Sequence, residues 1–424
     1  MEVAVPKRKL RVLMLSWEYP PYVVGGLGAH VAALAPALAR AGVQVHVITP
    51  RWKGGEPQEP LIADAGASRA KRQTRKRAMP PSVFRVEPPV MSLGNFFADA
   101  QQTNLYLGEQ AQVLYDRVGG FDLIHAHDWL VAFAAMSLKR LRKTPLLATI
   151  HATERGRGRG LLGGEMAQAI NGTEWWLAYE AWRVITCSRF MLDEVRNYFN
   201  VPPDKIDIVP NGVDASPFDE LAGVDLAEFR ARWARPDERI VFNVGRVVQE
   251  KGAQVIVEAA PCVLAEMPNT KFIIAGKGSI VDDLKRRAAE LGVQDRVVIA
   301  GFVSDPDRNR LLKVADAAIF PSLYEPFGIV ALEAMAAKCP VIVSAVGGLQ
   351  EVVQNDVTGV TIHPDNVESL AWGVLHTLRD PKRARARATK AYRVVKREYN
   401  WNRIAEQTIE VYERIVRERA RADW

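Results

Sequence analysis

The sequence predicts an α/β fold built from two doubly wound domains, each a parallel sheet covered by helices on both faces. Three observations lead to this prediction. A chain of 424 residues is too long for one ordinary hydrophobic core and suits two domains. Short apolar runs rich in β-branched residues alternate with helical patterns, as in parallel sheets. The alternation runs through the chain twice, with a polar stretch between the two series.

The first series contains seven short apolar runs that predict buried strands. These lie at residues 10–16, 43–49, 83–86, 122–126, 146–150, 184–187 and 206–209. Apolar residues at helical spacing predict helices in several of the intervals, at 27–40, 103–117 and 189–198. Residues 54–77 are charged and lack either period, so we expect a mobile loop there.

The second series contains six further runs. These lie at residues 240–244, 271–275, 296–300, 317–320, 341–343 and 359–362. Asn211-Gly212 is a strong turn signal and opens the polar stretch between the two series. We therefore expect a first domain at 1–213, a second at 214–398, and a C-terminal helix at 399–424.

Composition narrows the class of protein. Hydrophobic residues make up 48% and charged residues 25%, as in soluble globular proteins. The formal charge of +7 (56 − 49) gathers at residues 69–77 and 382–421. No aromatic residues interleave the first of these basic patches, so we expect no nucleic-acid partner, while peripheral contact with an anionic membrane stays open.

Cysteine usage and hydropathy bear on the compartment. The three cysteines lie far apart without metal-ligand spacing, which is typical of a reducing compartment, so we expect a cytoplasmic protein. No apolar run reaches the length of a membrane span. The apolar run after Lys9 is short and is followed by Glu18 and two prolines, so we interpret it as a buried strand rather than a signal peptide.

The segment from Glu325 to Ala336 carries the most information about function. Pro326 and Gly328 break the chain, and a helix can begin near Gly328 with Ile329, Val330, Leu332 and Met335 packing inward. A helix start of this kind binds anions. Glu333, in apolar surroundings, needs a partner, and a ribose diol would satisfy it. The arrangement is that of a nucleotide-sugar site.

Two cations follow the first strand of the second series. Arg246 and Lys251 come directly after residues 240–244, and ligands of open α/β sheets bind at the carboxyl ends of the strands. A guanidinium and an ammonium placed there can neutralise a diphosphate leaving group without a metal ion.

The first domain offers its own candidates at strand ends. A loop with Gly25 and Gly26 follows the first strand and opens a helix, where glycines let backbone N–H groups approach a phosphate. Asp128 and Trp129 are expected to begin a helix and face a cleft. His151 follows residues 146–150 and can donate to a sugar hydroxyl.

Two histidines of the first domain have the spacing of a metal pair. His125 and His127 point to the same face of a strand, as a metal pair would. No third ligand is evident, so we predict no metal site and interpret His125 as a core histidine with satisfied hydrogen bonds.

The spacing of Glu325 and Glu333, preceded by Pro-Ser-Leu-Tyr and followed by Gly347-Gly348, resembles the signature of retaining group 1 glycosyltransferases. Glycogen and starch synthases share this pattern, and the resemblance covers almost the whole chain. It implies the GT-B fold, with two Rossmann-like domains facing a cleft and a last helix that crosses back to the first domain. Trp401, Ile404, Ile409 and Tyr412 are expected to form the packing stripe of that helix.

The resemblance also implies roles for the candidate residues. Arg246 and Lys251 stabilise the leaving diphosphate, Glu325 contacts the transferred sugar, Glu333 binds ribose, and His151 contacts the sugar. Asp128 and Trp129 belong to the acceptor side. No metal or cofactor is implied beyond the nucleoside diphosphate sugar, which is a substrate. The remaining donor-binding positions are Gly26, Gly276, Phe302, Phe327, Gly328, Ile329 and Val330.

Several alternatives stay open. In glycogen synthases a lysine two residues before the glycine pair contacts donor phosphate, and here that position is Val23. An α-glucan synthase using ADP- or UDP-glucose is therefore an alternative to a transferase of glucose or a related hexose to another acceptor. A nucleotide-sugar epimerase would turn over donor without an acceptor, and a non-catalytic sensor would only bind it. The sequence does not determine the sugar, the base, the acceptor, the oligomeric state, or the roles of residues 69–77 and the Arg-Gly stretch 155–160, which suits either a lid or a disordered loop.

Overall fold

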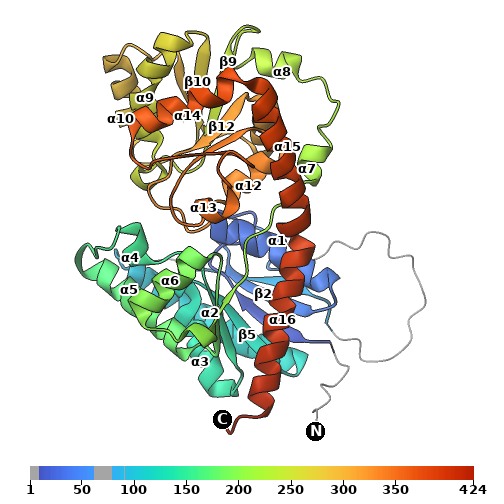
Figure 1. Cartoon of the computed structure of the whole chain (residues 1–424). Helices are drawn as coiled ribbons and strands as arrows, with labels where there is room; N and C mark the ends of the chain where they lie inside the picture. Colours follow the sequence, from blue (N-terminus) through green and yellow to red (C-terminus); the bar gives the residue numbers. More distant parts are fainter. Residues whose placement is uncertain (1–8, 62–78, 90) are drawn as a thin grey trace. The chain divides into compact units, whose positions relative to one another are not determined.

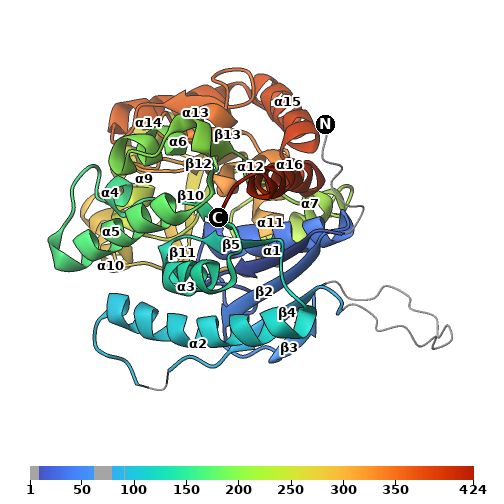
Figure 2. The same ribbon diagram turned by 90° about the horizontal axis from the view of Figure 1, so that it is seen from below.

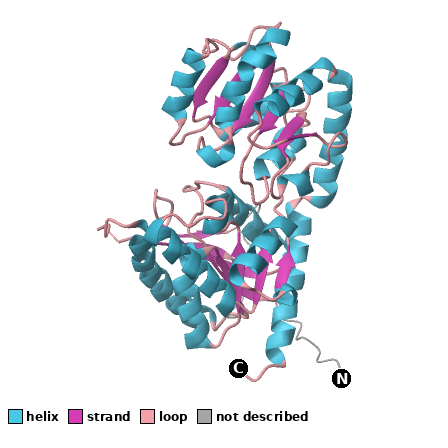
Figure 3. Ribbon diagram, turned by 60° about the vertical axis from the view of Figure 1, so that its left-hand side comes forward, coloured by secondary structure: helices cyan, strands magenta, loops and turns pink. Residues whose placement is uncertain are grey.

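Each half of the chain folds around a mainly parallel sheet with helices on both faces (Figure 3). The structure, a computed structural model, describes residues 9–61, 79–89 and 91–424. The chain divides into unit 1, formed by Met1–Pro210 and Trp401–Trp424, and unit 2, formed by Asn211–Asn400. The doubly wound α/β prediction is confirmed. The basic residues 69–77 lie outside the described part of the chain.

The sheet of unit 1 has eight strands in the order β3-β4-β2-β1-β5-β6-β7-β8. All neighbouring pairs are parallel except β3 and β4. The strands are β1 Arg11–Leu15, β2 Gln44–Pro50, β3 Gln58–Pro60, β4 Ser82–Val86, β5 Leu123–His127, β6 Leu146–Ile150, β7 Arg183–Thr186 and β8 Ile206–Ile208. The seven predicted strands of this half are present to within two residues. The predicted loop from residue 54 instead contributes the antiparallel edge strand β3.

Three helices of unit 1 begin with a capping side chain. Asn95, Thr153 and Ser188 accept hydrogen bonds from backbone N–H groups at the starts of α2, α4 and α6. The Arg-Gly stretch therefore begins as a short helix rather than an irregular loop. The helical elements are α1 Gly26–Arg40, α2 Phe96–Val118, η1 Trp129–Val131, α3 Ala132–Arg142, α4 Glu154–Arg157, α5 Gly164–Glu180, α6 Arg189–Phe199, η2 Pro203–Lys205 and α16 Trp401–Ala420.

The C-terminal helix belongs to the core of unit 1. α16 lies along α1, and α2 lies beside α3 (Figures 1 and 2). Ile404 and Tyr412 are fully buried against side chains of β1, β2 and α1, with Trp401 and Ile409 partly buried against the same cluster. The predicted packing stripe is thus confirmed.

The sheet of unit 2 has six parallel strands in the order β11-β10-β9-β12-β13-β14. They are β9 Arg239–Val244, β10 Thr270–Ala275, β11 Val297–Gly301, β12 Ala317–Phe320, β13 Val341–Ser344 and β14 Val360–Ile362. All six match predicted strands to within one residue. Strand order reverses beside β9, because β10 and β12 lie on either side of it, and such a switch point is where α/β sheets bind ligands.

Helices of unit 2 cover this sheet (Figure 1). Apolar side chains of α9, α10 and α14 pack with side chains of the strands in one core cluster. The helical elements are α7 Ser216–Asp219, α8 Ala227–Ala231, η3 Gln249–Lys251, α9 Ala253–Glu266, α10 Val281–Glu290, α11 Asp305–Val314, α12 Ile329–Ala336, α13 Leu349–Val352, α14 Val367–Arg379 and α15 Pro381–Glu398. None of the helices in the described part of the chain has the length and apolar character that a membrane crossing needs.

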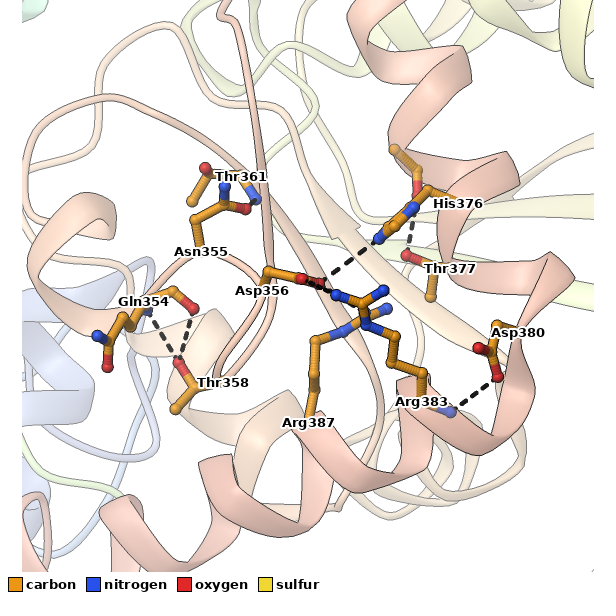
Figure 4. Close-up of polar contacts among 11 residues, drawn as sticks. Gln354, Asn355, Asp356, Thr358, Thr361, His376, Thr377, Asp380, Arg383 and Arg387 are labelled. Atoms are coloured by element: carbon orange, nitrogen blue, oxygen red, sulfur yellow. Dashed lines mark hydrogen bonds and ion pairs between the residues drawn. The ribbon is translucent and has the colours of Figure 1, made fainter.

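A polar cluster around Asp356 ties α14 and α15 to the loop before β14 (Figure 4). The Asp356 carboxylate lies 2.9 Å from Arg387 Nη1 and 3.5 Å from His376 Nε2, and it also contacts Arg383. Asp380 caps α15 by accepting a hydrogen bond from the Arg383 N–H. The first residues of the basic C-terminal region therefore serve the structure of unit 2.

Candidate functional site

Glu325 and Lys251 meet at the carboxyl ends of β12 and β9 in unit 2. The Glu325 carboxylate is buried, and its Oε2 lies 2.7 Å from Lys251 Nζ and 3.3 Å from Ser322 Oγ. The Lys251 side chain keeps 26% of its surface exposed. An ammonium has three N–H donors, so Lys251 can hold Glu325 and still donate to a ligand.

Backbone hydrogen bonds fix the loop that carries Glu325. The Leu323 N–H donates to the Glu250 carbonyl at 2.8 Å, and the Gly348 N–H donates to the Glu325 carbonyl at 3.0 Å. A methyl group at Gly348 would lie 2.4 Å from the Pro326 oxygen, so only glycine fits. The loops after β9, β12 and β13 therefore hold the carboxylate and the ammonium in fixed positions.

Arg246 lies in the same β9 loop but does not join the Lys251–Glu325 contact. Its side chain is 47% exposed and forms an ion pair with Glu250 at 3.2 Å. Gly245, just before it, directly follows β9. The second predicted cation thus lies near the switch point, with its guanidinium facing solvent.

The predicted helix start at Gly328 is present. Gly328 has φ +102°, and α12 begins at the next residue. Leu332 and Met335 are buried as predicted, but Ile329 and Val330 are only half-buried. The first turn of α12 therefore turns part of its surface outward. Phe327 packs inward, edge-on to Tyr399, so only its backbone is available to a ligand.

Glu333 already has a protein partner, which the sequence did not reveal. Arg308 Nη2 from α11 lies 3.3 Å from its Oε1. Burial raises the pKa of the Glu333 carboxyl group, and Arg308 opposes this shift. Arg308 also pairs with Asp305 at 3.0 Å, so the guanidinium is held from two sides. Only the fold brings these residues together.

The loops after β10 and β11 approach the β9 loop closely. The Gly276 N–H donates to the Gly301 carbonyl at 2.6 Å, and a methyl group at Gly276 would lie 1.8 Å from the Gly245 oxygen. Phe302 projects outward with 71% of its surface exposed, and Lys277 Nζ lies 5.6 Å from the centre of its ring. The exposed ring of Phe302, beside the closely packed backbone of the β9, β10 and β11 loops, suits a planar ligand.

In unit 1 the glycine loop is occupied by one of its own side chains. Glu18 Oε2 accepts hydrogen bonds from Val24 N–H at 2.8 Å and Gly25 N–H at 3.1 Å. A methyl group at Gly28 would lie 2.7 Å from the same oxygen. Two N–H groups just before α1 therefore hold a carboxylate, and Gly26, the first residue of the helix, lies directly beyond them.

Asp128 positions His151 through the backbone. Its Oδ1 accepts a hydrogen bond of 2.7 Å from the His151 N–H. Asp128 has φ +61° and ψ 176°, a conformation costly for any residue but glycine. Burial raises the pKa of Asp128 to about 6, while Arg157 and hydrogen bonds from His151 and Ala152 lower it.

The structure contradicts the expectation that Asp128 and Trp129 face an open cleft. Asp128 is buried, and the Trp129 ring is buried between Phe96 and Phe97, stacking on Phe97 at 5.6 Å. The strained backbone at Asp128 turns the tryptophan into the core. The acceptor-side role of these two residues stays a prediction.

Histidines of unit 1 cluster behind this loop. His125 is a core residue as predicted, with Nδ1 2.8 Å from the Tyr412 hydroxyl and Nε2 2.7 Å from the Thr149 hydroxyl. His30, His127 and His151 instead bring one ligand atom each within 4.8 Å of one another. The sequence made no third ligand evident, and the fold brings His30 from α1 and His151, which follows β6, to His127.

The buried carboxyl group of Glu174 makes the stability of unit 1 depend on pH. The carboxyl group is buried, and both of its oxygens lie 3.0 Å from the Glu154 N–H. Burial raises its pKa to about 8 from the reference value of 4.5. The fold therefore favours the protonated acid, and this contribution to stability is present below pH 4.5 and lost as the pH rises to 8.

Glu174→Gln is expected to reduce the loss of stability between pH 4.5 and pH 8, because the amide is neutral and keeps an acceptor oxygen. We expect the melting temperature of the variant, relative to the unchanged protein, to rise by about 3 °C between pH 5 and pH 8. Differential scanning fluorimetry across this range is the measurement. A constant difference between the two proteins would contradict the raised pKa.

Comparison with known proteins decides the family. Residues 226–394 match the model described as Glycosyl transferases group 1, and residues 24–216 match Glycosyltransferase Family 4. The chain is 36% identical over 405 residues to the uncharacterized glycosyltransferase MJ1607 of Methanocaldococcus jannaschii, covering 95% of this chain and 98% of that protein. The chain belongs to the group 1 glycosyltransferases. The resemblance read from Glu325 and Glu333 is thereby confirmed.

Other glycosyltransferases extend the comparison. The glycogen synthase of Mycobacterium tuberculosis strain H37Rv is 36% identical over 407 residues, covering 95% of this chain and 94% of its own. The structure of sucrose-phosphate synthase from Thermosynechococcus elongatus has a TM-score of 0.76 at 24% identity, covering 97% of this chain and 100% of that one. Starch synthase IV from Arabidopsis thaliana gives 0.74 at 19% identity with the same coverage. The fold of this glycosyltransferase is therefore GT-B.

Proposed function

We propose that this glycosyltransferase is a retaining enzyme that moves glucose or a related hexose from a nucleoside diphosphate sugar to an acceptor hydroxyl. One observation carries the proposal: the 2.7 Å contact between Lys251 and Glu325 at the switch point of the unit 2 sheet. It joins a cation suited to a diphosphate and a carboxylate suited to sugar hydroxyls.

Different residues of unit 2 bind different parts of the donor. Lys251 and Arg246 donate to the diphosphate, and the start of α12 after Gly328 adds its N–H groups. Glu325 accepts from hydroxyl groups of the transferred sugar. Such charge stabilisation is usually the largest catalytic term. Arg308 orients the Glu333 carboxylate for the ribose, and His151 of unit 1 donates to the sugar.

Transfer then needs no protein nucleophile. The acceptor oxygen attacks the anomeric carbon on the face from which the leaving phosphate departs, so the configuration is retained. The bond from that carbon to the phosphate oxygen breaks, and the departing phosphate takes the acceptor proton. Lys251 and Arg246 stabilise the negative charge that grows on the diphosphate.

An α-glucan synthase using ADP- or UDP-glucose is the second candidate. It is favoured by the 36% identity to a glycogen synthase, while the alpha-maltose-1-phosphate synthase of Mycolicibacterium smegmatis, 31% identical over 428 residues, points to a smaller acceptor. Val23, half exposed, replaces the lysine expected of a glycogen synthase. The three free cysteines fit a cytoplasmic enzyme.

The test combines a panel of nucleotide sugars with acceptors of increasing size, from glucose 1-phosphate to glycogen. Release of nucleoside diphosphate that depends on an acceptor supports transfer, and nuclear magnetic resonance of the product reports its anomeric configuration. Inversion, or donor turnover that no acceptor stimulates, would contradict the proposal. The acceptor that gives the highest kcat/KM separates the two candidates.

Activity is expected to survive chelation, because the cations for the diphosphate are carried by Arg246 and Lys251. After dialysis against EDTA, the initial rate is expected to stay within about twofold of the untreated enzyme, since no charge-stabilising group has been removed. A rate that falls to background and returns with magnesium or manganese would refute the metal-free scheme.

A further inference from the structure

Three histidines of unit 1 form a cluster that the proposed transfer reaction does not explain. His30 comes from α1, His127 ends β5, and His151 follows β6. One ligand atom of each lies within 4.8 Å of the other two. The ring centres of His30 lie 4.7 Å from His151 and 5.4 Å from His127. Three separate elements thus direct imidazoles to one point.

The spacing approaches that of a zinc site. Nδ1 of His127 lies 3.1 Å from Nε2 of His151. Tetrahedral zinc with Zn–N bonds of 2.0–2.1 Å places its ligand nitrogens about 3.3 Å apart. The third nitrogen, from His30, has to move inward by at most about 1.5 Å to complete three such edges, a shift within the reach of side-chain rotation.

Burial and chemistry select the kind of ion. His30 and His127 are buried, and His151 is half-buried, so the cluster opens on the His151 side. Neutral imidazoles suit zinc and similar transition metals, while magnesium and calcium prefer oxygen ligands.

We propose that His30, His127 and His151 bind Zn²⁺, and that the bound ion inhibits the enzyme reversibly. Three protein ligands leave a fourth coordination position for water, as in open zinc sites. Inhibition follows because a zinc-bound His151 no longer offers its ring to the sugar. This consequence rests on the proposed function of His151, whereas the binding of the ion does not.

Metal binding is measured first, without substrate. Cys262→Ser, which removes the exposed cysteine, serves as the background. Titration with Co²⁺ is expected to give the visible absorption of a low-coordinate site at one ion per chain, and Zn²⁺ is expected to displace it. His30→Gln and His127→Gln are each expected to weaken binding by at least about tenfold, the loss that even outer-shell changes cause.

A matched control is His363→Gln, which removes an exposed histidine of unit 2 and should leave binding unchanged. Melting curves show whether each variant is folded. If His30→Gln does not fold, His127→Gln and the spectrum of the background protein decide the question. Absence of a one-to-one cobalt spectrum, or equal zinc affinity in the folded ligand variants and the background protein, would overturn the site.

Inhibition is measured next with the best donor and acceptor. Zn²⁺ at ten times its dissociation constant is expected to lower the rate about tenfold. EDTA should restore the rate, and millimolar Mg²⁺ should have no effect. His30→Gln should keep its basal rate and lose sensitivity to zinc. Stoichiometric binding without inhibition would overturn the regulatory role, whereas cobalt binding by a protein that transfers no sugar would count against the proposed function alone.

Discussion

Lys251→Ala is expected to lower kcat by about 10²–10³-fold, because it removes a charge that acts mainly on the diphosphate leaving group. The ammonium lies 2.7 Å from Glu325 Oε2, so the variant removes this contact and leaves the carboxylate with Ser322 Oγ at 3.3 Å. Steady-state kinetics with the best donor and acceptor measures the effect. A near-normal kcat would remove Lys251 from the reaction.

Two controls separate the loss of catalysis from a loss of structure. Lys285→Ala removes an exposed lysine of α10 in the same unit, whose contact with Asp282 is 3.9 Å long, and should leave kcat unchanged. Lys251→Ala/Glu325→Gln removes the unpaired carboxylate charge. If the double variant regains stability but not turnover, the Lys251–Glu325 pair acts on the substrate. If turnover returns with stability, the pair is only structural.

Much of the fold was predictable because parallel strands covered on both faces need continuous apolar runs. Thirteen such runs matched strands to within two residues, since the apolar pattern stops where the strand leaves the core. Only β3 was missed. Its three residues, Gln58–Pro60, lie at the sheet edge with Gln58 and Pro60 exposed, so no apolar signal marks them.

The candidate site was predictable only in part. The motifs around Glu325 and Lys251 placed both residues at strand ends, where the structure has them. The partners that tune these groups come from distant elements, such as Arg308 for Glu333 and His30 for His127 and His151. The periodicity of apolar residues in a local segment carries no information about contacts between residues far apart in the chain. Trp129 was expected to be exposed at a cleft, but the backbone conformation at Asp128 turns its side chain into the core.

Substitution of Gly252 is expected to have a second large effect on turnover, because Gly252 directly follows Lys251 in the backbone. It follows η3 and precedes α9 with φ +73°, and a methyl group there would lie 1.8 Å from the Pro321 oxygen. Both the left-handed conformation and the clash oppose any side chain. Gly252→Ala therefore has to push the loop with Lys251 away from the loop with Glu325.

The matched control is Gly292→Ala in the same unit. Gly292 has φ +69°, but a methyl group there meets nothing within 4 Å. This variant bears only the conformational cost, about 1–2 kcal/mol. Gly252→Ala adds the steric cost and should lose about 3 kcal/mol or more, visible as a melting temperature at least about 6 °C below that of the unchanged protein.

The kcat of each variant, measured at a temperature where both are folded, then tests whether a displacement of Lys251 affects turnover. We expect Gly292→Ala to keep its kcat and Gly252→Ala to lose about 10²-fold, because a displacement near 1 Å at a catalytic group costs that much. Equal kcat values in the two variants would mean that the fixed distance between Lys251 and Glu325 does not matter to turnover. The double variant Gly252→Ala/Lys251→Ala should be no slower than Lys251→Ala alone, since the glycine acts through the position of the lysine.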